Sequence, residues 1–509
     1  MSPHVYSPLS DSENTELISF SHTSVEKETP RPYFERSQLT RKLCIAGLSF
    51  SWAVSIFCIT FGSFTSRIEY EPSVQWESLS DALILAQTAI LTLCQEALGY
   101  IHTVSLRWAL QRDGKLEFNS NLRLWQNAKM AGPNAWYGNL IVILGQVSTF
   151  GTSALTIAQD SDSGSGWLWF LGEAWIILGI GIGMQASVAT WALLSQQEWP
   201  TWSSNPMDVA AACLNQSWHP LVRRHGRSMQ GLDEISHPAM SMYPSSRQVC
   251  AYESNKDVRR LTLSIWIVFG LCCIWTAAVL IATAIRYPST LSLASFWNPF
   301  GFSGEYTYIP LLNRQSSPKG IIALDFLWLV ILICAMQSVV TLATHCAELH
   351  VNLSRDETTW RQASRKKGLL KTSNALTDAL SSHESMILLV LKIAIQWFYS
   401  LTFSIDNYEG LFLKGAQIMY MTVVVAILAL FATFLVLSKP KGPQPATFGH
   451  LQTLVDLVDE WPGRADKMYW GDKGWHTEPQ LRQVYSEGIR HAGTSKMPLE
   501  PIKMTAEYA

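Results

Sequence analysis

Residues 261–285, LTLSIWIVFGLCCIWTAAVLIATAI, decide the fold class of this chain. No charged side chain interrupts them, and roughly 20 apolar residues are enough for a helix to cross the ~30 Å hydrocarbon layer of a membrane. Lipid offers no hydrogen-bond partner to backbone amides, so a run of this length must be helical there. The stretch therefore predicts a transmembrane helix.

Seven further stretches have the same apolar character. Together with the first they predict eight spans, at residues 43–65, 79–106, 135–158, 167–194, 261–285, 321–353, 386–405 and 416–437. The composition agrees, since only 15% of the residues are Asp, Glu, Lys or Arg. We therefore expect an all-α integral membrane protein that contacts the lipid bilayer, in the plasma membrane or in an endomembrane.

The basic residues fall almost entirely in alternate connecting segments. Of the 38 Lys and Arg residues, 32 lie in the N-terminal tail, in the segments after the second, fourth and sixth spans, and in the C-terminal tail. Lys392 lies inside a span. The remaining five, all in the other connections, are Arg67, Arg286, Arg314, Lys319 and Lys414. Cationic segments resist translocation, so this asymmetry predicts that both termini are cytosolic.

The spans divide the chain into five segments. We expect a disordered cytosolic tail at 1–42, a four-helix half at 43–195, a cytosolic linker at 196–260, a second four-helix half at 261–437 and a cytosolic tail at 438–509. The linker holds several prolines and predicts mostly irregular structure. In the C-terminal tail, residues 450–461 predict an amphipathic helix that docks on the protein itself. Binding of this helix to a membrane surface or a partner is the alternative.

The two halves have the same layout. When Arg112-Asp113 is aligned with Arg355-Asp356, His102 falls on His345, and the third and fourth spans fall on the seventh and eighth without a gap. Four spans in each half leave the halves in the same orientation. The pattern therefore predicts a parallel 4+4 repeat whose axis lies along the membrane normal. A chance coincidence of spacing is the alternative.

Several short pieces resemble a known group of proteins. These are SLRWAL at 105–110, FNSNLRL at 118–124, HCAEL at 345–349 and GHLQTL at 449–454. They resemble a large group of uncharacterised fungal multipass membrane proteins, and the likeness extends over most of residues 41–508. The resemblance implies a membrane location and implies no activity.

Ionisable side chains inside the spans are the candidates for a functional site, because a charge in hydrocarbon is costly. The candidates are Glu96, His102, His345, Glu348 and Lys392. Lys392 lies about two turns inside the seventh span with apolar residues beside it. The rise of a helix places Glu348 slightly shallower and Glu96 slightly deeper, so we expect Lys392 to pair with one of them. Snorkelling of its ammonium to the cytosolic headgroups is the alternative.

His102, His345 and Glu348 lie toward the cytosolic ends of long helices, so they are either interfacial residues or a cluster that handles protons or ions. Gly179 and Gly183 have the spacing of close helix packing, with self-association as the alternative. The sequence contains no Walker A loop, no H-E-x-x-H and no G-x-S-x-G, which argues against an ATP-driven pump and two hydrolase classes. We expect no cofactor and no metal. A net charge of −2 gives no reason to expect a nucleic-acid partner.

Three classes of function remain open. The first is a secondary transporter or channel for an unidentified small molecule or ion. The second is a non-catalytic membrane organiser, and the third, which we favour least, is an intramembrane enzyme that acts on a lipid or terpenoid. A cavity at mid-depth lined by Glu96 and Lys392 would favour transport, whereas a closed core would favour the organiser. Carboxylates that converge in an apolar pocket would favour the enzyme.

Overall fold

The computed structural model of the chain describes residues 33–34, 38–67, 74–75, 80–121, 125–129, 132–159, 167–195, 199–286, 323–370, 382–406, 410–463, 466–475 and 489–509. The tail expected to be disordered lies outside these residues at 1–32 and 35–37. Its last residues, 38–42, belong to the first helix.

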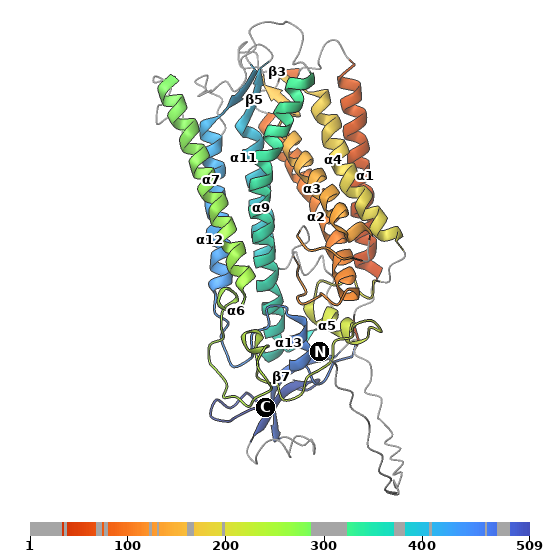
Figure 1. Cartoon of the computed structure of the whole chain (residues 1–509), viewed down its shortest axis with the longest axis vertical. Coiled ribbons are helices and arrows are strands. Elements are labelled where there is room, and N and C mark those ends of the chain that lie inside the picture. Colours follow the sequence, from red (N-terminus) through yellow and green to blue (C-terminus); the bar gives the residue numbers. More distant parts are fainter. Residues whose placement is uncertain are drawn as a thin grey trace, which may run out of the picture. The chain divides into compact units, whose positions relative to one another are not determined.

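Seven helices are long and apolar enough to cross a membrane among the described residues (Figure 1). They are α1 (Gln38–Thr65), α2 (Ser80–Arg112), α4 (Gly172–Leu194), α7 (Lys256–Arg286), α9 (Ala323–Arg361), α11 (His383–Thr402) and α12 (Gly415–Leu437). Each overlaps one of the predicted spans, so the chain is a multipass integral membrane protein. Residues 167–170 and 403–405, which were predicted as parts of spans, form short strands instead. The third predicted span corresponds to α3 (Trp136–Ser153), which has 18 residues and several polar side chains.

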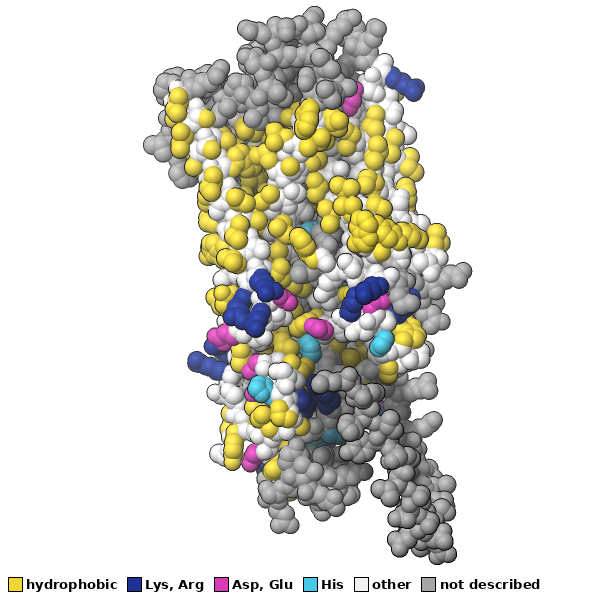
Figure 2. Space-filling model, viewed as in Figure 1, with side chains coloured by type: hydrophobic (Ala, Val, Ile, Leu, Met, Phe, Trp, Pro, Cys, Tyr) yellow, Lys and Arg dark blue, Asp and Glu magenta, His cyan; other side chains and the backbone are white. Residues whose placement is uncertain are grey.

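The outer faces of the helices suit lipid. On α7, Leu263, Ile267, Leu271 and Ile274 follow helical spacing along one side and remain 47–67% exposed within the protein. In Figure 2, hydrophobic side chains cover the upper part of the visible face, and most charged side chains gather below them. Large apolar side chains in such numbers on a protein surface need an apolar surrounding, which the hydrocarbon layer supplies.

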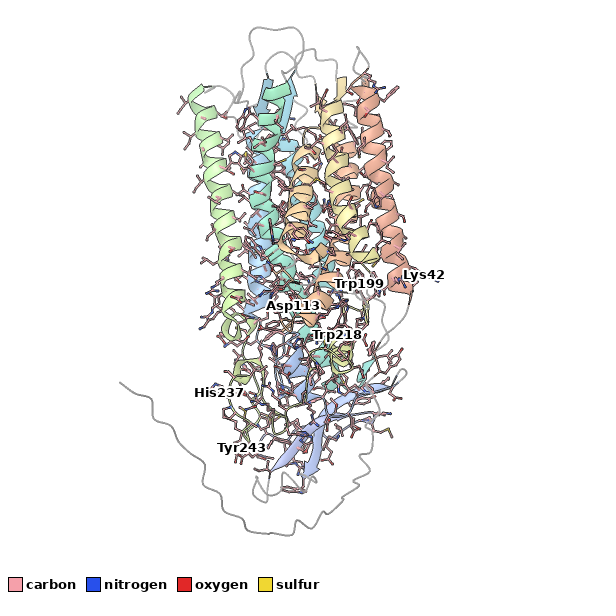
Figure 3. All side chains as sticks on the ribbon, turned by 45° about the vertical axis from the view of Figure 1, so that its right-hand side comes forward. Lys42, Asp113, Trp199, Trp218, His237 and Tyr243 are labelled. Atoms are coloured by element: carbon pink, nitrogen blue, oxygen red, sulfur yellow. The ribbon has the colours of Figure 1, made fainter. Side chains whose placement is uncertain are left out.

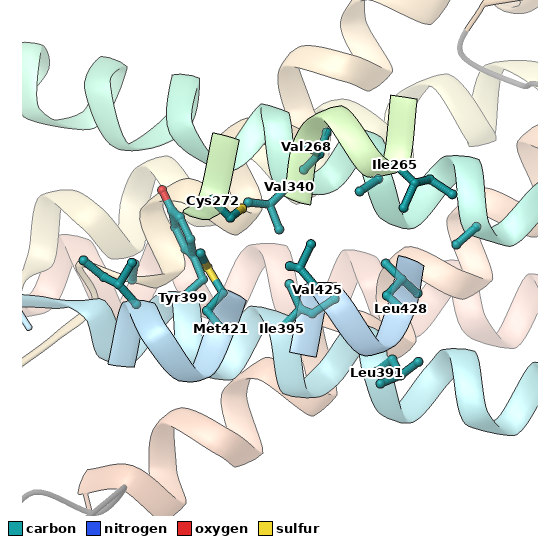
Figure 4. Packing of buried hydrophobic residues seen from close by; sticks show 14 of the residues in the cluster. Ile265, Val268, Cys272, Val340, Leu391, Ile395, Tyr399, Met421, Val425 and Leu428 are labelled. Atoms are coloured by element: carbon teal, nitrogen blue, oxygen red, sulfur yellow. The ribbon is translucent and has the colours of Figure 1, made fainter. Parts of the chain in front are cut away.

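The helices of each half pack in the same order. In the first half α1 lies against α4, α4 against α3, and α1 against α2. In the second half α7 lies against α12, α12 against α11, and α7 against α9. Buried side chains such as Val268, Val340, Ile395 and Val425 bring all four helices of the second half into one core (Figure 4).

The two halves meet through their second and third helices. α2 of the first half packs against α11 of the second, and α9 of the second half packs against α3 of the first. A short antiparallel strand pair also joins the third and fourth helices of each half. It is formed by β2 (Ile157–Gln159) with β3 (Trp167–Phe170), and by β5 (Phe403–Asp406) with β6 (Gly410–Leu413). In the first half, β1 (Val74–Gln75) adds a third strand beside β3. These strands were not expected from the sequence.

One end of the bundle, where α2, α4, α9 and α12 finish, carries the folded part of the linker and tail. We call this the basic end. Its apolar core contains Trp108 from α2, Trp360 from α9, Tyr508 from the tail and Phe34 from before α1. In Figure 3, Lys42, Asp113 and Trp199 lie at the junction with the helices, and His237 and Tyr243 lie farther out.

The described part of the linker is mostly irregular, as expected. It also contains three short helical pieces, which are α5 (Pro206–Leu214), the 3-10 turn η3 (Leu232–Glu234) and α6 (Ala251–Ser254). Nearly all of α5 is buried, and this burial stabilises a helix too short to form alone.

The tail contributes the short helix α13 and two long strands. The predicted amphipathic helix is α13 (Leu451–Leu457), which ends earlier than residue 461 and buries Leu451, Leu454 and Val455 against the protein itself. Strand β7 (Lys467–Trp475) pairs with β8 (Arg490–Ser495) and with β4 (Leu369–Leu370). The described basic end also holds the 3-10 turns η2 (Gly132–Asn134) and η4 (Gln362–Ser364).

The face shared by Gly179 and Gly183 is occupied by α1. A Cβ atom added to Gly179 would lie 2.7 Å from the Ser55 carbonyl oxygen, and one added to Gly183 would lie 3.0 Å from the Ser55 hydroxyl. Ser55 in turn donates a 2.7 Å hydrogen bond to the Gly179 carbonyl. The glycines therefore allow two helices of the same chain to approach closely, and self-association through them stays a prediction without support.

Candidate functional site

Lys392 is the centre of a charged cluster between the two halves. Its ammonium nitrogen lies 2.6 Å from Glu96 Oε1 on α2 and 3.1 Å from Glu348 Oε2 on α9. The lysine side chain is 12% exposed, Glu348 is 23% exposed and Glu96 is 40% exposed. Lys392 was expected to pair with one of these two carboxylates, and in the structure its ammonium contacts both.

His345 joins the same cluster from α9. Its Nδ1 lies 3.5 Å from Glu348 Oε2, one turn farther along the helix, and its Nε2 lies 3.1 Å from Gln146 Oε1 on α3. The cluster thus takes side chains from α2, α3, α9 and α11, the four helices through which the halves meet. We call Glu96, His345, Glu348 and Lys392 the charged cluster.

The charged cluster borders a small cavity. Glu96, Lys392 and His345 line it together with Gln95, Gln146, Thr92, Thr341, Thr344, Gln337, Gln396 and the apolar Phe150, Val340 and Ile395. The cavity has a volume of about 30 Å³, and one water molecule needs roughly 10–15 Å³. The cavity therefore has room for about two water molecules.

His102 lies outside this cavity. It is 3% exposed and borders a neighbouring space formed by α2, α3 and α4, whose lining includes Gln95, Gln146 and Gln185 but no carboxylate. Gln95 and Gln146 line both spaces. The structure thus brings four of the five predicted site residues together and places the fifth beside them.

Glutamines complete the polar lining, and sequence reasoning missed them. Gln396 on α11 donates to the Phe150 carbonyl at 2.9 Å and to the Ser153 hydroxyl at 3.1 Å, both on α3. Gln337 on α9 donates to the Gln396 side chain. The predicted site residues were all ionisable, so the uncharged glutamines were not among them. An uncharged amide in hydrocarbon also needs a partner, so glutamines within apolar spans were the available signal.

A second buried network ties the halves at the basic end. Arg107 on α2 donates to the Asn119 and Ser203 carbonyls at 3.1 and 2.9 Å. Asn119 Nδ2 donates to Asp356 Oδ2 on α9 at 2.9 Å. Glu357, the next residue, accepts hydrogen bonds from the backbone amides of the tail at 2.8 and 2.9 Å.

The path of the tail past Asp356 requires a glycine. Gly449 has φ +74°, and a Cβ atom there would lie 2.5 Å from Asp356 Oδ2. The sequence pattern does not mark Asp356 as a site residue. The structure shows that it connects the first half, the second half and the tail.

Among the residues that the structure describes, no three His, Cys, Asp or Glu side chains gather in a way that could hold a metal ion. Glu96 and Glu348 are bridged by Lys392, so neither stands alone in an apolar pocket as an intramembrane acid catalyst would. The arrangement places one ammonium between two carboxylates where the halves meet. No family model, curated protein or solved structure matches the chain.

Proposed function

We propose that the protein is a secondary transporter or channel whose functional site is the charged cluster between two parallel four-helix halves. The observation that carries this proposal is Lys392, held between Glu96 and Glu348 at the wall of a water-sized cavity where the halves meet. Ionisable groups inside membrane segments commonly mark ion and proton pathways. Sites in transporters with internal repeats commonly lie between the repeats.

The proposal includes eight membrane crossings. Phe34 and Tyr508 belong to the same buried core at the basic end, so the chain must cross an even number of times between them. α3 supplies the eighth crossing. Asn134 before α3 bonds to Ser105 near the basic end of α2, whereas Thr156 after α3 bonds to Gln87 near the start of α2.

Packing supports the proposed duplication. The order of helix contacts within each half is the same. Between the halves, the second helix of each half packs against the third helix of the other, α2 against α11 and α9 against α3. Rotating the protein by about half a turn around the membrane normal would bring each of these two contacts onto the other. The paired strands after α3 and after α11 occupy equivalent places in the two halves.

We further propose that the basic end faces the cytosol, because 32 of the 38 Lys and Arg residues lie in the segments assigned to that side. The cavity then lies partway into the membrane from the cytosolic face. Its size favours protons or small ions over organic molecules.

A non-catalytic organiser is the second candidate. The folded basic end favours it, since the linker and tail pack with the ends of α2 and α9 into one apolar core, to which they contribute Met207, Leu454 and Trp470. An organiser does not require charged groups at a cavity between the halves, and for that reason we place it second.

The test is reconstitution of the purified protein in liposomes, with gradients of H⁺, Na⁺, K⁺ and Cl⁻ imposed one at a time. We expect a flux above that of protein-free liposomes for at least one of them, and a loss of at least about tenfold in Lys392→Ala. Lys441→Ala is the matched control, because Lys441 is an exposed lysine at the basic end. Absence of flux for all four ions in folded protein would overturn the proposal in favour of the organiser.

A further inference from the structure

We infer that the basic end binds the headgroup of an anionic phospholipid where α7 begins and α12 ends. The binding surface is a cationic patch made of Lys256, Arg259, Arg260 and Lys439. None of these residues belongs to the charged cluster, so lipid binding here is independent of the proposed transport function. Four features carry it: the contacts that assemble the patch, its excess of positive charge, its place at the edge of the lipid-facing surface, and a cavity beside it.

The patch is assembled from the ends of three packed helices. α7 begins two residues after α6 ends, and both helices pack against α12. Lys439, which follows α12, places its ammonium nitrogen 3.1 Å from Glu253 Oε1 on α6. Farther along the bundle, the Trp266 indole on α7 donates to the Thr433 hydroxyl on α12 at 3.0 Å. These contacts bring the cations at the start of α7 beside the cation that follows α12.

Two members of the patch form ion pairs that leave them accessible. Arg260 Nη1 lies 3.0 Å from Asp257 Oδ1, and Lys439 pairs with Glu253. The four side chains of these pairs are 49–79% exposed. Exposed ion pairs contribute little, because water screens the charges and two flexible side chains lose freedom. A phosphate group at the membrane surface can therefore take the place of either acid.

The other two members have no acidic partner. Lys256 and Arg259 are exposed, and neither forms an ion pair within the part of the chain that the structure describes. The four cations of the patch and the two acids beside them, Glu253 and Asp257, leave a net charge of +2. Basic residues next to a transmembrane helix attract the anionic phospholipids of the cytosolic leaflet, toward which the proposed orientation turns this end.

The patch lies at the edge of the surface that faces lipid. Leu263 follows Arg259 by one turn of α7 and is 60% exposed. Phe434, in the last turn of α12 before Lys439, is 69% exposed. Figure 2 shows Lys and Arg side chains gathered where the apolar surface ends. A phospholipid whose acyl chains pack on these apolar side chains therefore holds its phosphate at the level of the patch.

A cavity of about 140 Å³ adjoins the patch at Lys439. Its lining includes three hydroxyl side chains and two apolar residues of α12, which are Ser354, Thr358, Ser438, Leu435 and Val436. Thr358, Ser438 and Lys439 are themselves exposed, so the cavity opens at the surface. Glu357 also lines it, but this carboxylate accepts from Arg361 at 2.7 Å and from backbone amides of the tail. Hydroxyl groups form hydrogen bonds with phosphate oxygens, so the cavity gives a headgroup at Lys439 a polar place to enter.

The test is native mass spectrometry of the purified protein in detergent, with phosphatidylserine or phosphatidylcholine of equal chain length added. Phosphatidylserine should bind at least about tenfold more tightly than phosphatidylcholine. Lys256→Gln/Arg259→Gln removes the two cations that have no acidic partner, so it should weaken phosphatidylserine binding at least about fivefold. Glu253→Gln releases Lys439 from its acid and should strengthen the binding.

Lys366→Gln/Lys367→Gln is the matched control. It also removes two exposed cations that form no ion pair among the described residues, but these lysines lie between α9 and β4. It should leave phosphatidylserine binding unchanged. Thermal unfolding of the same preparations should show both double variants as stable as the natural sequence, because all four side chains are exposed.

Equal binding of the two lipids would overturn the inference. An equal loss of binding in Lys366→Gln/Lys367→Gln would also overturn it, by showing attraction to the overall charge and no site at the patch. Displacement of phosphatidylserine by an excess of inorganic phosphate would do the same, because the site would then recognise a free phosphate and not a membrane lipid. None of these outcomes changes the expected ion flux, so lipid binding and transport are tested separately.

Discussion

Lys392 Nζ on α11 and Glu96 Oε1 on α2 lie 2.6 Å apart, although 296 residues separate them in the chain. The pair connects the second half of the protein to the first beside the small cavity between them. Because Glu348 also contacts the same ammonium, removing the lysine takes one cation away from two carboxylates.

Lys392→Ala should therefore destabilise the protein by about 3 kcal/mol, since an acid stranded after loss of its buried partner is costly. The double variant Lys392→Ala/Glu96→Gln should recover part of that loss, because one stranded charge is gone. Thermal unfolding in detergent checks both expectations, with Lys441→Ala as the exposed control. A double variant no more stable than Lys392→Ala would show that the pair does not stabilise the fold.

The α3–α9 contact between the halves requires a small residue. A Cβ atom on Gly151 would lie 2.5 Å from the Cys334 sulfur and 2.9 Å from the Cys334 Cα. Gly151→Ala should therefore lower the free energy of unfolding by about 1–3 kcal/mol through overpacking. Gly270→Ala in α7 is the matched control: nothing lies within 4 Å of its added Cβ, and alanine should be neutral or stabilising there. Equal stability of the two variants would place α3 and α9 farther apart than described.

Topology can be checked with introduced cysteines. Arg67 is exposed at the end of α1 opposite the basic end, and Met497 is 72% exposed in the tail. The background protein has its partly exposed Cys273 and Cys334 replaced by Ala, and it is carried at the surface of intact cells. A membrane-impermeant maleimide added to these cells should label Arg67→Cys. Met497→Cys should react only after permeabilisation. Labelling of Met497→Cys in intact cells would place the basic end outside.

Asp459 should make the basic end sensitive to acid. Burial opposes ionisation of this carboxyl, but hydrogen bonds from His491, Lys473 and Thr494 outweigh burial and lower its pKa. Because the pKa of Asp459 is lower in the folded state than its value of about 4 in the unfolded chain, the carboxylate stabilises the fold above about pH 4. This stabilisation is lost as the pH falls from there toward the folded-state pKa.

Asp459→Asn should therefore reduce the free energy of unfolding by about 2 kcal/mol at neutral pH and by less near pH 3. Thermal unfolding as a function of pH measures this difference. Asp257→Asn, at a side chain 71% exposed, is the control and should change little at either pH. A loss of stability in Asp459→Asn that is equal at both pH values would contradict the assignment.

The sequence predicts the membrane helices well because long apolar runs leave the backbone no alternative. It also predicts the pairing of Lys392, because a charge in hydrocarbon needs a partner and helical rise locates the candidates. Gln146 and Gln396 were not predicted as site residues, although an amide within an apolar span needs a partner; the sequence does not show which helix supplies that partner.

Tertiary contacts explain the remaining differences. α5 forms because neighbouring segments bury it, and β7 pairs with β8 and β4, so none of these depends on local sequence alone. The short strands β2, β3, β5 and β6 are likewise set by pairing between segments. Asp356 on α9 likewise lies against residues 119–120 and against the tail. These contacts join segments that are far apart in the sequence.

The central claim is that the charged cluster serves transport and does not merely hold the helices together. The most direct measurement is ion flux through liposomes containing the neutral variant Lys392→Met/Glu96→Gln/Glu348→Gln, with thermal unfolding recorded on the same preparation. Replacing a buried ion cluster by uncharged groups of similar size is often neutral or stabilising, so the variant should remain as stable as the natural sequence. We predict a stable protein whose flux has fallen at least about tenfold. A stable variant with undiminished flux would contradict the claim and leave the cluster a structural connection only.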